Sequence, residues 1–144
     1  MSHIQISDYF DILDRSRKVY YRLLEPVCTE TGLTRNEVDV LLFLWNNPAF
    51  DRASDIVSRR GMAKSHVSQS VSNLADRGLV ERVWSPTDRR TVHLKLTAAG
   101  KAVTEQAREA QEAFFSLLHR DIPPEEMDTF RIVTGKIWEN IRNL

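Results

Sequence analysis

The sequence is poor in the features that mark disulfide frameworks, membrane spans and loop-rich folds. Its one cysteine, Cys28, excludes an internal disulfide framework and fits a reducing cytosol. The longest uninterrupted apolar run, residues 40–45, is far shorter than a membrane-spanning helix requires. The first residues lack a basic stretch followed by an apolar core, so we expect no secretory signal and a cytoplasmic location. Five glycines and five prolines in 144 residues leave room for long helices.

The residue patterns of catalytic and metal centres are missing too. The histidines are His3, His66, His93 and His119, and no two of them are four residues apart, as a helical metal site would place them. One cysteine allows no Cys-x-x-Cys pair. We find no glycine-rich phosphate loop and no nucleophile motif. The sequence therefore predicts a protein that is not an enzyme and has no metal site or cofactor.

Charge has no overall sign but is unevenly distributed along the chain. The sequence has 20 basic and 20 acidic residues. Residues 52–95 contain nine basic and four acidic side chains, which gives this segment a net charge of +5 and the rest of the chain −5. A basic middle between acidic ends indicates either a nucleic-acid partner or a solvated face, and charge alone does not separate the two.

The apolar periodicity predicts helices on both sides of a short hairpin. A helix over residues 4–28 is closed by Gly32, and a capping box of Thr34 and Glu37 begins a second helix that ends at residues 46–48. Two short helices, residues 53–59 and 63–77, are joined by a tight turn at Gly61 and form a helix-turn-helix. Residues 79–84 and 91–96 then predict two β-strands joined by a turn. The last helices begin at Thr97 and at residues 123–126.

These elements predict a mainly α fold with a small β-hairpin wing, a winged helix-turn-helix. The length fits a single domain, residues 1–144, with a winged-helix lobe at 32–97. The terminal segments, 1–31 and 98–144, carry long apolar stripes that one small core can hardly cover. We expect them to interlock in a two-fold dimer, and the alternative is a helical cap on a monomer.

One face of the fourth helix has the composition of a DNA-reading surface. With Val67, Val71 and Leu74 turned inward, short polar side chains point outward, and such side chains can contact base edges or phosphates. We expect contacts mainly from its N-terminal half. The predicted contact residues are Lys64, Ser65, His66, Ser68 and Gln69. Arg89 and Arg90, at the hairpin tip, are predicted to enter the minor groove. Further phosphate-contact candidates are Arg52, Arg59, Arg60 and Arg77.

Three segments resemble the MarR family of bacterial transcription regulators: residues 61–68 (GMAKSHVS), 74–80 (LADRGLV) and 88–100 (DRRTVHLKLTAAG). Gly-Leu-Thr at residues 32–34 also matches the family. The resemblance implies a homodimer that reads a pseudo-palindromic operator and is released by a small ligand. It also implies that Arg90 is the wing arginine and that Asp88 orients the wing by ion pairing. Ala63 departs from a frequent serine cap, which should weaken the helix start by about 1 kcal/mol.

The resemblance implies a ligand site between the terminal helices and the winged helix. Trp45 and Trp84 are the candidate residues, with core packing as the alternative for both, as it is for Tyr9, Tyr20 and Tyr21. The sequence thus predicts a homodimeric, sequence-specific regulator that binds double-stranded DNA, a repressor released by a small molecule. The alternative is a winged-helix protein-interaction module without specific DNA binding.

Overall fold

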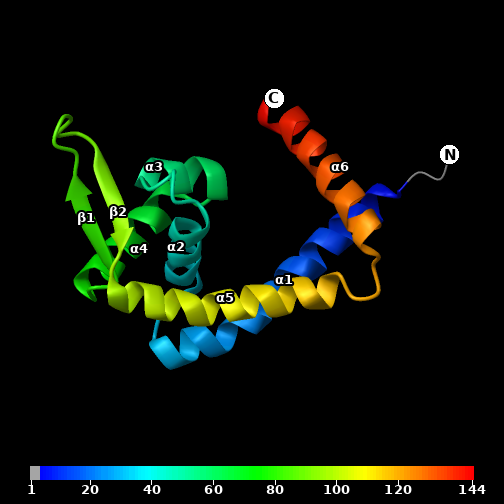
Figure 1. The fold of residues 1–144 in the computed structure, drawn as a ribbon, viewed down its shortest axis with the longest axis horizontal. Helices are drawn as coiled ribbons and strands as arrows, with labels where there is room; N and C mark the ends of the chain where they lie inside the picture. Colours follow the sequence, from blue (N-terminus) through cyan, green and yellow to red (C-terminus); the bar gives the residue numbers. More distant parts are fainter. Residues whose placement is uncertain (1–3) are drawn as a thin grey trace.

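The computed structural model describes residues 4–144, so the predictions that involve residues 1–3, including His3, lie outside the described residues. The chain folds into helices and one hairpin (Figure 1). In chain order the elements are α1 (Ile6–Thr31), α2 (Arg35–Asn46), α3 (Ala53–Asp55), η1 (Ile56–Arg60), α4 (Lys64–Asp76), β1 (Val80–Trp84), β2 (Val92–Leu96), α5 (Ala98–Leu118) and α6 (Pro124–Arg142). The mainly α fold with a β-hairpin wing is confirmed.

The core of the winged-helix lobe is built around α2. This helix begins at the predicted capping box, where the Thr34 hydroxyl accepts from the Glu37 N–H and the Glu37 carboxylate accepts from the Thr34 N–H. Residues 40–44 of the apolar run are buried in this helix, together with Glu37, Val38 and Asp39 before them. Helices α4 and α5 and the wing pack around it, and its core partners include Ile56, Val67, Leu74 and Leu94.

The segment before α4 differs from the prediction, which was one short helix over residues 53–59. One turn of α-helix, α3, passes into the π-helix η1, which ends at Gly61 with φ of 73°. Apolar spacing cannot distinguish the two helix types, because both place residues about four apart on one face. The π turn buries Ile56 completely and brings Arg60 to the surface of α2. Such π turns occur often at functional sites.

The wing is the predicted hairpin. Strands β1 and β2 pair antiparallel, from Val80 opposite Leu96 to Trp84 opposite Val92. At its root, the Thr97 N–H donates to the Leu79 carbonyl and the Thr97 hydroxyl to the Gly78 carbonyl. A Cβ at Gly100 would overlap the Leu79 carbonyl oxygen, so the start of α5 lies directly against the backbone just before β1.

The terminal helices leave large apolar surfaces exposed. Helix α1 runs along α5, whereas α6 departs from the far end of α5 and stands apart from the winged-helix lobe (Figure 1). No residue of α6 is buried, and its apolar stripe, with Phe130, Ile137 and Ile141, is at least 39% exposed. Patches of this size on a single chain indicate a surface that another molecule covers. Among the described helices, none is both long and apolar enough to cross a membrane.

Candidate nucleic-acid interface

Helix α4 presents the two faces that the sequence predicts. Val67, Val71 and Leu74 are at most 5% exposed and pack against the core. The five predicted contact residues in its N-terminal half are all solvent-exposed. Ser70 is 4% exposed and lies on the inner face, which explains how a serine-rich helix can still pack closely. The outer face of α4 is therefore free to approach a partner.

The position of α4 is fixed by a chain of polar contacts that sequence reasoning did not find. The Asn73 amide nitrogen donates to the Glu37 Oε1 at 2.9 Å, while the other carboxylate oxygen of Glu37 closes the capping box of α2. The Gln69 amide in turn donates to the Asn73 Oδ1 at 3.1 Å. Because an amide nitrogen has two hydrogens, Gln69 keeps one donor and its oxygen for a base. Asn73 thus links Gln69, on the outer face of α4, to Glu37 of α2.

Arg77, one of the predicted phosphate contacts, has a backbone partner inside the protein. Its Nη2 donates to the Thr31 carbonyl at 2.6 Å, across the end of α1. This bond satisfies one of the free carbonyls at the C-terminus of α1 and joins α1 to α4. The structure therefore gives Arg77 an architectural contact, whereas the Lys64 side chain, at the start of α4, has no hydrogen bond or ion pair to the described residues.

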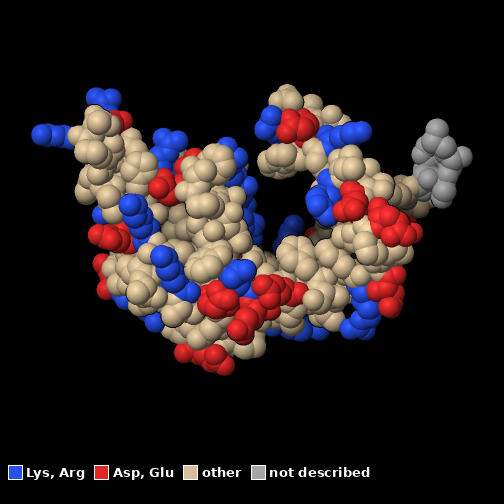
Figure 2. All heavy atoms as spheres, viewed as in Figure 1, with Lys and Arg blue, Asp and Glu red and all other residues tan. Residues whose placement is uncertain are grey.

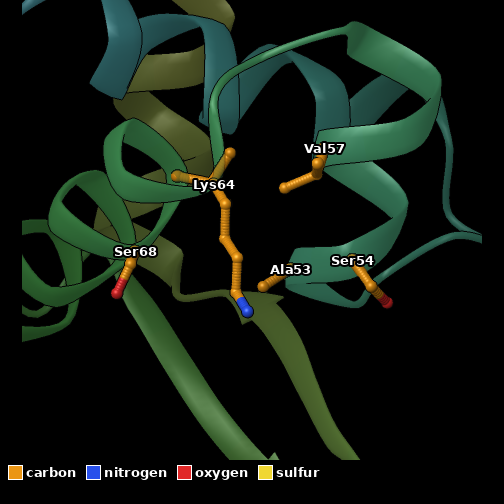
Figure 3. A pocket seen from close by; sticks show the side chains of 6 residues that line it. Ala53, Ser54, Val57, Lys64 and Ser68 are labelled. Carbon is orange, nitrogen blue, oxygen red and sulfur yellow. The ribbon is translucent and has the colours of Figure 1, made fainter.

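The start of α4 carries no side-chain cap. Ala63 occupies the N-cap position with extended backbone angles, and no side chain of the described residues accepts from the first N–H groups. This agrees with the departure noted from the sequence, and Ser65 supplies no compensating bond. Beside this turn lies an apolar hollow of about 390 Å³ between α3, η1 and α4, with the Lys64 side chain extended across it (Figure 3).

Asp88 orients the wing tip, but not by the ion pair that the family resemblance implies. Its Oδ1 accepts from the Arg90 N–H at 3.0 Å and its Oδ2 from the Thr91 hydroxyl at 2.9 Å. Within the described part of the chain, no arginine lies within ion-pair distance of Asp88. The Arg90 N–H, and then the Thr91 hydroxyl, hold the pKa of this carboxyl below its usual range. The guanidinium groups of Arg89 and Arg90 are left available at the tip.

Basic side chains lie at the wing tip and on the lobe beside it. Figure 2 shows lysine and arginine side chains at the tip of the wing and along the adjacent edge of the lobe. The helix α4 and the wing lie next to one another at this end of the molecule (Figure 1). A duplex approaching the outer face of α4 therefore meets the wing arginines as well.

The predicted ligand residues, Trp45 and Trp84, do not occupy one cavity. Trp84 is 62% exposed at the tip end of β1. Trp45 borders a hollow of about 320 Å³ against β2, with the Arg108 guanidinium 5.1 Å from the centre of its ring. Neither lines the hollow at the junction of the terminal helices and the winged helix, which has a volume of about 340 Å³. That hollow is lined by Ser16, Arg17, Tyr20, Arg60, Gln111, Phe114 and Phe115.

Sequence reasoning also missed a buried polar cluster beside this hollow. Asp39 is 3% exposed, and its Oδ2 accepts from the Tyr21 hydroxyl at 2.9 Å and from Arg60 at 3.1 Å. Its Oδ1 is buried without a hydrogen-bond partner among the described residues. Burial raises the pKa of Asp39 above its usual range, although Arg60 and Tyr21 act in the opposite direction. The feature of the sequence that could have revealed this cluster is the position of Asp39 between Val38 and Val40, next to the apolar run of α2.

Cys28 lies half-buried near the end of α1. Burial, and then the nearby Glu25, raise the pKa of its thiol above the ordinary value. Because the thiolate is the reactive form, this environment lowers the reactivity of Cys28. Within the described chain there is no group of three histidine, cysteine or acidic side chains placed to hold a metal ion.

The exposed polar face of α4, the wing and the packing beneath them define a winged helix-turn-helix DNA-binding protein. Comparison with known proteins shows which family the chain resembles. The model of the MarR family matches residues 31–91. The HTH-type transcriptional repressor YetL of Bacillus subtilis is 23% identical over 134 residues, which cover 92% of this chain and 80% of the relative.

Solved structures agree over nearly the whole chain. The MarR-family transcriptional regulator of Silicibacter pomeroyi is 25% identical and superposes with a TM-score of 0.82, covering 96% of this chain and 93% of its own. CouR of Rhodococcus jostii, solved with bound p-coumaroyl-CoA, is 22% identical, has a TM-score of 0.75, and covers 94% and 95% of the two chains. Over residues 31–91 the chain is thus similar to the MarR family of transcription regulators, and it shares the fold of MarR-family structures over nearly its whole length.

Proposed function

We propose that this protein is a homodimeric repressor that binds a pseudo-palindromic operator and leaves it when a small molecule binds. The observation that carries the DNA-binding part is the outer face of α4, which is exposed and polar and is flanked by the wing arginines. Lys64, Ser65, His66, Ser68 and Gln69 would lie in the major groove. Arg89 and Arg90 would approach the backbone and minor groove beside it.

The homodimer rests on the exposed apolar surfaces of the terminal helices. The stripe of α6 continues into a hollow of about 520 Å³ where α1, α5 and α6 meet. A second copy would cover both, since a two-fold interface pairs the same patch on two subunits. The dimer would place two α4 helices in successive major grooves, about 34–36 Å apart.

The small-molecule response rests on the hollow around Tyr20, Arg60 and Gln111. It combines aromatic walls from Phe114 and Phe115 with the basic side chains of Arg17 and Arg60. Arg60 is the last residue of η1, three residues before the N-cap of α4, so a ligand that moves Arg60 would act on the reading helix. A planar organic anion suits these walls. If it binds the DNA-free state of the dimer more tightly than the DNA-bound state, it would shift the population of dimers toward the DNA-free state.

Selection from a random duplex pool at physiological salt tests the DNA-binding proposal. We expect enrichment of an inverted repeat with half-sites about one helical turn apart. Weak binding to every duplex, with strong salt dependence, would contradict it and favour the protein-interaction alternative.

The ligand proposal is tested by titrating benzoate, a simple planar anion, against the protein on its selected operator. We expect benzoate to weaken operator binding of the wild type, and to weaken it less in Arg17→Gln. A matched control is Arg15→Gln, which removes an exposed arginine of α1 that does not line the hollow. An equal response in all three proteins, or none in any of them, would contradict this site.

A further inference from the structure

A small polar hollow lies where the wing meets α3, the first helix of the helix-turn-helix. It has a volume of about 240 Å³. The segment around α3 contributes Arg52, Ala53 and Ser54, and the wing contributes Arg90, Thr91 and Val92. We refer to these six residues as the wing cleft. Two arginines from segments almost forty positions apart in the sequence thus line one small space.

The walls of the wing cleft are held together by Asp51. Its backbone carbonyl accepts from the Leu94 N–H at 2.7 Å, and its Oδ1 lies 2.7 Å from the His93 Nδ1. These bonds join β2 to the residue that immediately precedes Arg52. On the opposite wall, Asp88 fixes the Arg90 backbone through the Arg90 N–H. The positions of both arginines are therefore set by the backbone, before any partner binds.

The donors that face the wing cleft are mostly unused. Arg52 directs its Nε to Asp55 at 3.4 Å, and neither of its Nη groups has a hydrogen-bond partner within residues 4–144. The Arg90 guanidinium has no hydrogen bond or ion pair to any of the described residues. Two guanidinium groups around one space repel each other unless an anion lies between them, and the planar guanidinium fork matches the oxygens of a phosphate.

The wing cleft is also continuous with the reading face. Ala53 and Ser54 line both the wing cleft and the apolar hollow beside α4 that Lys64 crosses (Figure 3). A DNA strand that follows the outer face of α4 therefore passes the wing cleft on its way to the wing tip. The anion available at that position is a phosphate of the DNA backbone.

We propose that the wing cleft binds a single backbone phosphate of duplex DNA, held jointly by Arg52 and Arg90. This inference rests on the proposed function and changes the assignment of the wing arginines. Arg90 becomes a backbone contact that sets the register of the wing, and Arg89 is left as the residue that enters the minor groove. The division follows from the cleft, because Arg90 lines it and Arg89 does not.

Salt titration separates the two roles. We expect Arg52→Ala and Arg90→Ala each to reduce the slope of log Kobs against log salt by up to about 0.9, equally on the selected operator and on a scrambled duplex. Because the two arginines share one phosphate, the double variant should lose no more than this. Arg52→Lys keeps the charge and should keep the slope. Arg82→Ala is the matched control, since it removes an exposed wing arginine that does not line the cleft. An unchanged slope in Arg52→Ala, or an equal loss in Arg82→Ala, would overturn the proposal.

A backbone scan then tests whether both arginines hold the same phosphate. Single phosphates of the operator are replaced in turn by neutral methylphosphonates, and each duplex is titrated with wild type, Arg52→Ala and Arg90→Ala. We expect one position where the replacement weakens wild-type binding but has little further effect in either variant. Two different positions for the two variants would overturn a shared site. Circular dichroism and thermal unfolding verify that each variant is folded.

The two proposals fail in different ways. If the wild type enriches no sequence, the proposed function is wrong, while the slopes on the scrambled duplex still decide whether the wing cleft binds phosphate. If the wild type selects an operator but Arg52→Ala and Arg90→Ala bind it with the wild-type slope, only the wing cleft is wrong.

Discussion

Asp39 is the residue whose burial links folding stability to pH. Its carboxyl group is buried in α2, and one of its two oxygens depends on Arg60 and Tyr21. Burial raises the pKa of Asp39 in the folded state, so the folded chain holds its proton more tightly than the unfolded chain does. A group with a raised pKa contributes its full stability below its unfolded pKa and loses it as the pH rises through the folded value.

We therefore predict that Asp39→Asn changes the pH dependence of stability. Relative to this variant, the wild type should lose free energy of unfolding as the pH rises from about 4 upward, since only the wild type must ionise a buried carboxyl. Urea unfolding of both proteins over a pH series measures the difference. A constant difference across the series would show that Asp39 titrates normally in the fold.

Arg60→Ala should strengthen the pH dependence that Asp39→Asn removes. Without Arg60, nothing of opposite charge compensates the Asp39 carboxylate, and its pKa should rise further. At neutral pH we expect a loss of about 1–3 kcal/mol, below the cost of breaking a fully buried pair because the Arg60 side chain is 40% exposed. Unfolding at pH 7 checks the magnitude, and recovery of part of the loss near pH 4 would identify Asp39 as its cause.

At the scale of elements, local sequence determined most of what could be predicted. Periodicity identified the inner face of α4, and the Thr34–Glu37 spacing located the start of α2. Contacts between distant residues were beyond such reasoning: Glu37 also binds Asn73, which is 36 positions away. The π-helix η1 was missed because its period is too close to that of an α-helix. Spacing alone also did not identify the partners of Arg77 and Asp88, which are the Thr31 carbonyl and the Thr91 hydroxyl.

The uncapped start of α4 gives a prediction about one element. Ala63→Ser should supply the missing cap and stabilise the protein by about 1 kcal/mol, because the backbone at Ala63 already has the extended conformation of an N-cap. Ala99→Ser is the matched control. It places the same side chain inside the first turn of α5, where serine is slightly less favourable than alanine. Urea unfolding measures both, and a gain of the same size in the control would exclude capping as the explanation.

At the scale of the whole molecule, the terminal helices and the winged-helix lobe differ in how much of their apolar surface one chain buries. The winged-helix lobe has its own buried core around α2, whereas α6 buries no residue within one chain. The apolar stripes predicted from the sequence alone that these helices pair with a second copy, but the surface of that partner is not encoded in any local pattern. DNA affinity and self-association should therefore be linked, since two weakly bound lobes gain affinity only when joined.

Ile137→Glu should expose this linkage. A carboxylate in the middle of the α6 stripe would have to be buried in a dimer interface, so we expect dissociation to a 16.6 kDa monomer and at least a hundredfold loss of operator affinity. Gly135→Glu adds the same charge on another side of α6, where no atom lies within 4 Å of the new Cβ, and should remain dimeric. Sedimentation and operator titration measure the two quantities on the same samples. A monomeric Ile137→Glu with unchanged operator affinity would show that one subunit reads its site alone, and the lobes would then be independent.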